Sequence, residues 1–200
     1  MDKDWTGNKN SVFKTLGASN HTDKERENND FYATDPIAID ILCSVEKFDG
    51  IIYEPACGQG HLSERLKHYG YEVKSSDLIN RGYGKGGIDF LKINKPLNCN
   101  IITNPPYKIA SEFIEKALEL IPDGKKVCMF LKVQFLEGKA RKKMFEKYPP
   151  KTVYVSSSRI LCAKNADFEG MKKGGGSAVA YCWYVWEKGY KGNTILKWVN

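Results

Sequence analysis

The segment from Cys99 to Ile121 combines three features that together restrict the fold. Cys99–Thr103 is an apolar run typical of a short buried strand, and apolar residues then recur at helical spacing at Ile109, Phe113, Ala117 and Ile121. Between them lies the turn Asn104-Pro105-Pro106-Tyr107. A strand that leads through a tight turn into a helix predicts an open α/β sheet, in which ligands bind at the carboxyl ends of the strands.

The chemistry of this turn suits a planar ring that carries an exocyclic amine. The two prolines fix φ and remove two backbone donors, so the turn is stiff and its carbonyls are free to accept. Asn104 adds an amide oxygen and Tyr107 adds a flat aromatic face. The alternative is a proline-stiffened turn with a packed tyrosine.

A second strand–turn–helix unit precedes the first. Ile51–Glu54 predicts a strand, Pro55–Gly60 a glycine turn, and Leu62, Leu66 and Tyr69 one face of a helix. This layout could bind a dinucleotide, but Ser63 stands where GxGxxG requires its third glycine. Asp77 follows the predicted strand 71–76 and lies 77 − 58 = 19 residues beyond Gly58, which suits a carboxylate that accepts from ribose hydroxyls. The alternative for Asp77 is an Asx-turn cap.

The two turns carry a family resemblance. Asn104-Pro105-Pro106-Tyr107 resembles the catalytic motif of the S-adenosylmethionine-dependent amino-methyltransferases, and Glu-Pro-x-x-Gly-x-Gly from Glu54 to Gly60 resembles their cofactor motif. The resemblance runs from about residue 31 to the C-terminus. It is greatest to the small, phage-type enzymes that methylate N6 of adenine in DNA.

The resemblance implies roles for particular residues. The catalytic set is Asn104, Pro105, Pro106 and Tyr107, and the cofactor set is Tyr32, Thr34, Glu54, Pro55, Ala56, Gly58, Gly60, Asp77, Asp89 and Phe90. Glu54 and the glycine backbone would hold the amino acid end of S-adenosylmethionine, with residues 31–36 beside its methionine end. Asp89 and Phe90 would hold its adenine, although a capping aspartate and a core phenylalanine explain that pair nearly as well. No metal is required.

The expected architecture is a doubly wound, mostly parallel Rossmann-like methyltransferase sheet of seven strands with an antiparallel edge and helices on both faces. Asp35 and Pro36 predict the start of a helix that runs to about Lys47. Later strands are expected at 126–131, 152–155, 177–186 and 194–199, the last two forming the antiparallel edge. Residues 81–87 and 162–176 are expected to be flexible loops. The predicted domains are a polar, flexible arm over 1–30 and a methyltransferase domain over 31–200.

Net charge and composition indicate which kinds of partner and which cellular compartment to expect. The net charge of +7 favours a polyanion such as DNA, or alternatively RNA. The candidate phosphate-binding residues are Lys139, Arg141, Lys142, Lys143, Lys172 and Lys173, although the first four could be an ordinary solvated helix face. Six cysteines without a CxxC pair indicate a reducing compartment with neither disulfides nor a zinc site. No apolar run approaches about 18 residues and no signal-peptide pattern is present, so a cytoplasmic protein without membrane contact is expected.

The predicted function is transfer of a methyl group from S-adenosylmethionine to N6 of adenine in DNA. Little sequence specificity is expected unless a partner chain supplies target recognition, because the chain leaves no room for a separate reading module. The motif also serves enzymes that methylate an RNA base or a protein glutamine amide. A non-catalytic nucleic-acid-binding protein that kept the fold is the remaining alternative.

Overall fold

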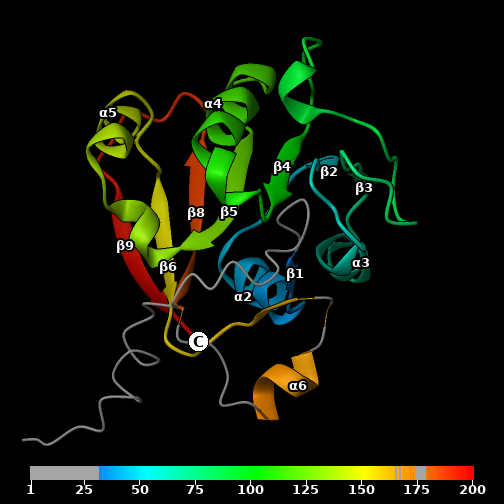
Figure 1. Ribbon diagram of the computed structural model, residues 1–200. Coiled ribbons are helices and arrows are strands. Elements are labelled where there is room, and N and C mark those ends of the chain that lie inside the picture. Colours follow the sequence, from blue (N-terminus) through cyan, green and yellow to red (C-terminus); the bar gives the residue numbers. More distant parts are fainter. Residues whose placement is uncertain (1–31, 165, 167, 174–178) are drawn as a thin grey trace, which may run out of the picture.

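The computed structural model describes residues 32–164, 166, 168–173 and 179–200. A seven-stranded sheet runs through them in the order β3–β2–β4–β5–β8–β6–β9 (Figure 1). Its strands are β2 (Ile52–Glu54), β3 (Val73–Ser75), β4 (Asn100–Thr103), β5 (Lys126–Lys132), β6 (Thr152–Ser156), β8 (Tyr181–Glu187) and β9 (Ile195–Val199). The predicted arm over 1–30 lies outside the described residues.

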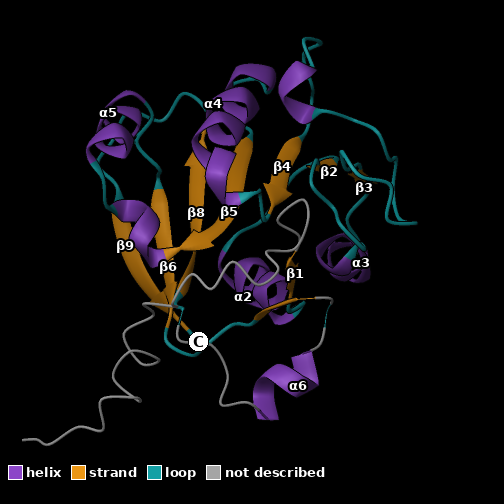
Figure 2. Ribbon diagram, in the orientation of Figure 1, coloured by secondary structure: helices purple, strands orange, loops and turns teal. Residues whose placement is uncertain are grey.

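Helices cover both faces of this sheet, as a doubly wound fold requires (Figure 2). The α-helices are α2 (Ile37–Val45), α3 (His61–His68), α4 (Ala110–Leu120), α5 (Lys139–Lys147) and α6 (Phe168–Lys173), and the 3₁₀ helices are η1 (Phe90–Lys92), η2 (Tyr107–Ile109) and η3 (Val133–Leu136). Successive strand residues point to opposite faces. Ile102 therefore packs in the core formed with α2 and α3, whereas Ile101 packs in the core formed with α4 and α5.

The predicted fold class is confirmed, but the reversed strand lies elsewhere than expected. Strands β3, β2, β4 and β5 are parallel, β8 is antiparallel to both β5 and β6, and β9 is parallel to β6. The last two strands therefore do not pair with each other, because β6 lies between them. The burial explains this order: six successive residues of β8 are buried, as an interior strand requires, whereas four of the five β9 residues are exposed, as at an edge.

A second, two-stranded sheet was not predicted. β1 (Tyr32–Thr34) pairs antiparallel with β7 (Cys162–Lys164), and Thr34 lies opposite Cys162. The prediction of one flexible loop over 162–176 is therefore wrong for β7 and for α6, while its run of glycines lies outside the described residues. The rings of His61 and Phe168 lie 5.8 Å apart, which joins α6 to the start of α3.

The prediction that 81–87 is flexible is also wrong. Lys85 N donates to Ser75 O over 2.9 Å and Asp77 N donates to Lys85 O over 3.1 Å, so Lys85 is hydrogen-bonded beside the end of β3. A Cβ on Gly84 would lie 2.7 Å from Ser75 O, which explains the need for glycine at this close approach. The helix predicted from Asp35 begins as expected, with Asp35 Oδ1 accepting from Ile37 N over 3.1 Å.

Candidate active site

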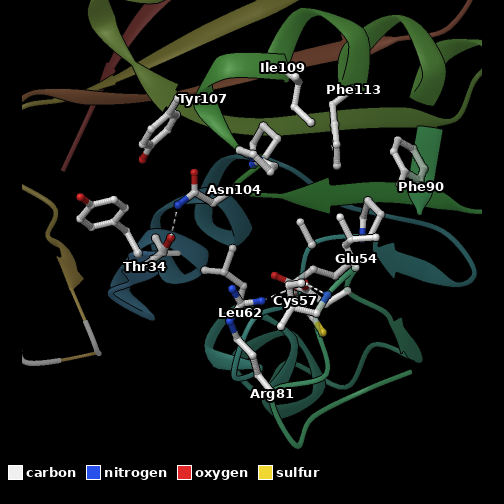
Figure 3. A pocket seen from close by; sticks show the side chains of 18 of the residues that line it. Thr34, Glu54, Cys57, Leu62, Arg81, Phe90, Asn104, Tyr107, Ile109 and Phe113 are labelled. Carbon is white, nitrogen blue, oxygen red and sulfur yellow. Dashed lines mark hydrogen bonds and ion pairs between the residues drawn. The ribbon is translucent and has the colours of Figure 1, made fainter. Parts of the chain in front are cut away.

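A pocket of about 500 Å³ lies where β1, β2 and β4 end. Its volume falls within the range of small-molecule sites. It brings together most of the residues predicted from the two turns: Tyr32, Thr34, Glu54, Pro55, Ala56, Asp77, Asp89, Phe90, Asn104, Pro105, Pro106 and Tyr107. The predicted catalytic and cofactor residues are therefore neighbours in space, along one continuous cavity (Figure 3).

Asn104 lies directly after β4 and is oriented by β1. Its Nδ2 donates to Thr34 Oγ1 over 2.8 Å. Its Oδ1 is buried and accepts no hydrogen bond within the described part of the chain. Figure 3 shows the amide nitrogen directed at Thr34 and the oxygen on the opposite side. Leaving a buried acceptor unpaired costs about 1–3 kcal/mol, so this oxygen is poised for a donor that none of the described residues supplies.

The backbone of the same turn supplies a second acceptor. The Pro106 carbonyl accepts from Ile109 N over 3.1 Å, whereas no donor from the described residues reaches the Pro105 carbonyl. Asn104 Oδ1 and Pro105 O are thus two free acceptors on one rigid turn.

Tyr107 belongs to a cluster of uncharged polar side chains. Its hydroxyl donates to Cys162 Sγ over 3.7 Å, and its ring centroid lies 6.2 Å from that of Tyr181. Burial raises the pKa of Tyr107 well above its ordinary value, and burial also raises the pKa of the Cys162 thiol. Neither group is therefore ionised near neutral pH. The ammonium of Lys132 lies 5.1 Å from the Tyr107 ring centroid.

Glu54 ends β2 inside the pocket with only 2% of its surface exposed. Burial raises its pKa to about 8, although the hydroxyl of Ser63 donates to the carboxylate and opposes this shift. Ser63 occupies the position of the missing third glycine and also contacts Ser75 Oγ at 2.6 Å. A carboxylate at this depth favours a cationic ligand group, which would offset the cost of burying its charge.

Asp77 organises the glycine turn. Its Oδ2 accepts from Gly58 N over 2.8 Å, and its Oδ1 accepts from Ile79 N over 2.9 Å and from Arg81 Nη1 over 3.0 Å. The Asx turn, which the sequence offered as the alternative to ribose binding, is therefore present. Since Asp77 also lines the pocket, it can serve a ligand as well.

The two predicted glycines lie beside the pocket and are not part of its lining. Gly58 donates to Asp77, as described above. Gly60 adopts φ +86°, and a Cβ there would lie 2.6 Å from the ring of Tyr83. Gly60 is therefore needed for a close approach of Tyr83, and this contact differs from the ligand approach expected from the sequence.

Asp89 and Phe90 have the capping and core-packing roles that the sequence offered as the alternative to adenine binding. Asp89 Oδ1 accepts from Leu91 N over 3.1 Å and so caps η1, and Phe90 is 2% exposed and packs 4.9 Å from the ring of Phe113. Both residues also line the pocket, where Phe90, Phe113 and Ile109 form an apolar wall.

None of the described basic residues of α5 and α6 lines the pocket. On α5, the guanidinium of Arg141 lies over the Phe135 ring and Nε donates to Glu137 O, while Lys142 pairs with Glu146 over 3.6 Å. Lys139, Lys142 and Lys143 are exposed, as a solvated helix face would be. Lys173 is exposed at the end of α6, and the side chain of Lys172 lies outside the described part.

Sequence reasoning missed several residues of the site. Arg81, Ile109 and Phe113 line the pocket, and Cys162 contacts Thr34, Asn104 and Tyr107. The helical pattern after Tyr107 could have indicated Ile109 and Phe113. Cys162 carried no such signal, since its contacts span 55 to 128 residues.

All six cysteines are free and buried. Within the described ranges, no three His, Cys, Asp or Glu side chains are grouped so that they could hold a metal ion. None of the helices described has the length and apolar character needed to span a membrane.

Comparison with known proteins identifies the fold. No protein-family model and no curated protein matches the sequence. Among solved structures, one similar chain is a protein assigned as a class I S-adenosylmethionine-dependent methyltransferase from Listeria monocytogenes, with TM-score 0.54 and 15% identity over 81% of this chain. Another is assigned as the modification subunit of a type I restriction enzyme from Vibrio vulnificus, with TM-score 0.58 and 11% identity over 94% of this chain. A third is assigned as an O-methyltransferase from Agrobacterium tumefaciens, with TM-score 0.55 and 13% identity over 80% of this chain and 85% of that protein.

The chain spans 62% of the Listeria protein and 50% of the Vibrio subunit. At these identities the likeness establishes the fold, which is that of the class I S-adenosylmethionine-dependent methyltransferases.

Proposed function

We propose that this protein transfers a methyl group from S-adenosylmethionine to the N6 amino group of adenine in DNA. The observation that carries the proposal is the unpaired Oδ1 of Asn104, which is buried and turned away from Thr34. An exocyclic amine is a donor of the required kind. Because Oδ1 is shielded from solvent, a hydrogen bond formed there would be stronger than one made in water.

The chemistry requires little beyond these acceptors. Adenine N6 is a weak nucleophile because its lone pair is delocalised into the ring. Acceptance of its two hydrogens by Asn104 Oδ1 and Pro105 O favours a pyramidal nitrogen and stabilises the positive charge that develops on it. The Tyr107 ring would stack on the base, which must leave the duplex to reach a pocket of this kind. The excess proton leaves to water after transfer.

The chain's residues fit S-adenosylmethionine along the rest of the pocket. Glu54 would accept from the cofactor's ammonium, Asp77 from its ribose hydroxyls, and Phe90 and Phe113 would contact its adenine. Tyr32, Thr34, Pro55 and Ala56 line the same cavity, and the cofactor when bound would supply an activated methyl group. Gly58 would act indirectly, through its hydrogen bond to Asp77.

DNA is favoured as the acceptor by the net charge of +7. The structural likeness to a modification subunit of a restriction enzyme adds support. That neighbour is a subunit, which also supports a partner chain for target recognition. The described residues comprise one sheet with its covering helices, the β1–β7 pair and α6, so we expect little built-in sequence specificity.

One experiment tests the proposal directly. The full chain is incubated with methyl-tritiated S-adenosylmethionine and DNA, RNA or protein, and the products are digested and separated as nucleosides or amino acids. The label should appear as N6-methyldeoxyadenosine. Asn104→Ala should lower turnover about a hundredfold or more while leaving cofactor affinity nearly unchanged. Asn193→Ala, at an exposed position near the C-terminus, is the matched control.

Label recovered only in RNA or in a glutamine amide would mean that the methyl acceptor is that group and not adenine in DNA. Cofactor binding in a calorimeter without transfer to any acceptor would favour the non-catalytic alternative. Near-normal turnover of Asn104→Ala would contradict the mechanism.

A further inference from the structure

Lys132 is the last residue of β5 and carries a charge that no described carboxylate balances. It is partly buried, and its ammonium lies against the ring of Tyr107, 5.1 Å from the centroid. Tyr107 itself lines the pocket directly after the Asn104 turn. The charge therefore lies next to the proposed position of the target base.

Several other partly buried lysines are paired with acids. Lys116 meets Glu119 at 3.2 Å, Lys125 meets Asp49 at 2.7 Å and Lys126 meets Glu46 at 2.5 Å. The last of these lies on the same strand as Lys132. Lys188, also partly buried, donates to the carbonyls of Glu119 and Ile121, so Lys132 differs from these lysines in that no oxygen of the described residues accepts from its ammonium.

The described side chains around Lys132 do not compensate its charge. The side chains grouped with it are Tyr107, Cys162 and Tyr181, all of which stay protonated near neutral pH because burial raises their pKa values. The neighbouring Lys108 is exposed and lines the pocket, which adds a second positive charge beside Tyr107. An anionic ligand group would find attraction here and no opposing carboxylate among the described residues.

We propose that Lys132 binds a backbone phosphate of the target nucleotide and so holds that nucleotide on Tyr107. This inference rests on the proposed function, because it takes the polyanion to be the methyl acceptor. A base stacked at Tyr107 brings its flanking phosphates close by, and a lysine ammonium is suited to a phosphate as a compact point charge. The contact positions the substrate and carries no sequence information.

The phosphate contact gives Lys132 a role distinct from that of the basic face of α5. There, Lys142 has Glu146 as a partner and the guanidinium of Arg141 packs on Phe135. Lys132 instead lies against the ring of Tyr107, which lines the pocket, so its loss should affect the productive complex as well as overall attraction to DNA.

The test measures DNA affinity as a function of salt for the wild-type chain, Lys132→Gln and Lys197→Gln. Lys197 is an exposed lysine on the edge strand β9, so its substitution makes the same charge change away from Tyr107. Lys132→Gln should weaken DNA binding about tenfold at low salt and reduce the slope of log affinity against log salt by about 1. The Michaelis constant for DNA should rise, with a smaller change in turnover and no change in cofactor affinity. Lys132→Arg should recover most of the affinity.

Thermal unfolding and calorimetry with S-adenosylmethionine check that each variant is folded, and Lys132→Met provides a second uncharged variant with an intact stem. A salt slope for both uncharged variants equal to that of Lys197→Gln would overturn the inference. A loss of cofactor affinity in place of DNA affinity would also overturn it, since Lys132 would then serve the cofactor's carboxylate.

The outcomes for the wild-type chain separate the two proposals. If it methylates DNA and Lys132→Gln has the same salt slope as the wild type, the phosphate contact is wrong and the proposed function still holds. If the wild-type chain neither binds nor methylates DNA, the proposed function fails with the phosphate contact.

Discussion

Asn104 and Thr34 are joined by a hydrogen bond of 2.8 Å from Nδ2 to Oγ1, although 70 positions separate them in the chain. Fixing the nitrogen of a planar amide also fixes its oxygen, which is left without a donor among the described residues. Thr34 therefore determines which end of the Asn104 amide is left without a described partner, and under the proposed function it would position that oxygen without touching the reacting atoms.

Thr34→Val should separate this positioning role from binding. Valine keeps the β-branched shape but removes the oxygen acceptor, so Nδ2 keeps only its 3.9 Å contact with Cys162 Sγ and the amide orientation is no longer fixed. Loss of a buried hydrogen bond costs about 1–3 kcal/mol, and the same increase in the activation barrier would lower turnover about 5- to 150-fold. Steady-state kinetics measure the change, and Thr34→Ser, which keeps the hydroxyl, should retain most of the turnover. Equal turnover for Thr34→Val and Thr34→Ser would show that the hydrogen bond from Asn104 to Thr34 is not needed.

Asp77→Ala should weaken cofactor binding by about 2–4 kcal/mol, because two charge-assisted hydrogen bonds to the ribose would be lost. Isothermal titration with S-adenosylmethionine measures this, with exposed Asp123→Ala as the matched control. Since Asp77 also accepts from Gly58 and Ile79, circular dichroism should accompany the titration. Unchanged affinity in a folded variant would remove Asp77 from the cofactor site.

Glu54 should make stability depend on pH. Burial raises its pKa from the ordinary 4.5 to about 8, so the folded chain keeps a proton that the unfolded chain has already lost. The corresponding stabilisation is complete below about pH 4.5 and is lost as the pH rises through about 8.

Urea unfolding at pH 5 and at pH 8 measures this loss, and Glu54→Gln should show a smaller decrease over the same interval because glutamine does not titrate. An equal decrease in both proteins would mean that Glu54 does not carry the effect.

Methylation by the purified chain alone should occur at adenine in a short or degenerate sequence context. Under the proposed function, the basic face of α5 would bind phosphates and the pocket would select adenine, but neither would read many neighbouring bases. Sequencing of treated DNA for modified adenine measures the context. Modification confined to one motif of about five or more fixed base pairs would mean that the chain contains a reading element of its own.

The parts of the site that the sequence predicted are those encoded by short segments. Glu54 and Asn104 each end a strand and precede a glycine or proline turn, so local pattern was enough to place them at one edge of a sheet. The pocket brings both together, as expected.

The parts that were missed depend on contacts between distant segments. Thr34 and Cys162 lie opposite each other across β1 and β7 at a separation of 128 residues, and no local periodicity records such a pairing. Hydrophobic alternation identified the segments of β8 and β9 as strands, but it does not state which strands become their neighbours. Only their unequal burial reveals that β8 is interior and β9 is at the edge.

The place of β8 between β5 and β6 has a consequence for the order in which the protein can form during its synthesis. β5 and β6 are made first, yet neither pairs with the other, because both pair with β8. A nascent chain that ends before Tyr181 therefore has a gap in the middle of its sheet, with two open strand edges that a chaperone or another nascent chain could cover. The interior of the sheet closes only when residues 181–187 have left the ribosome.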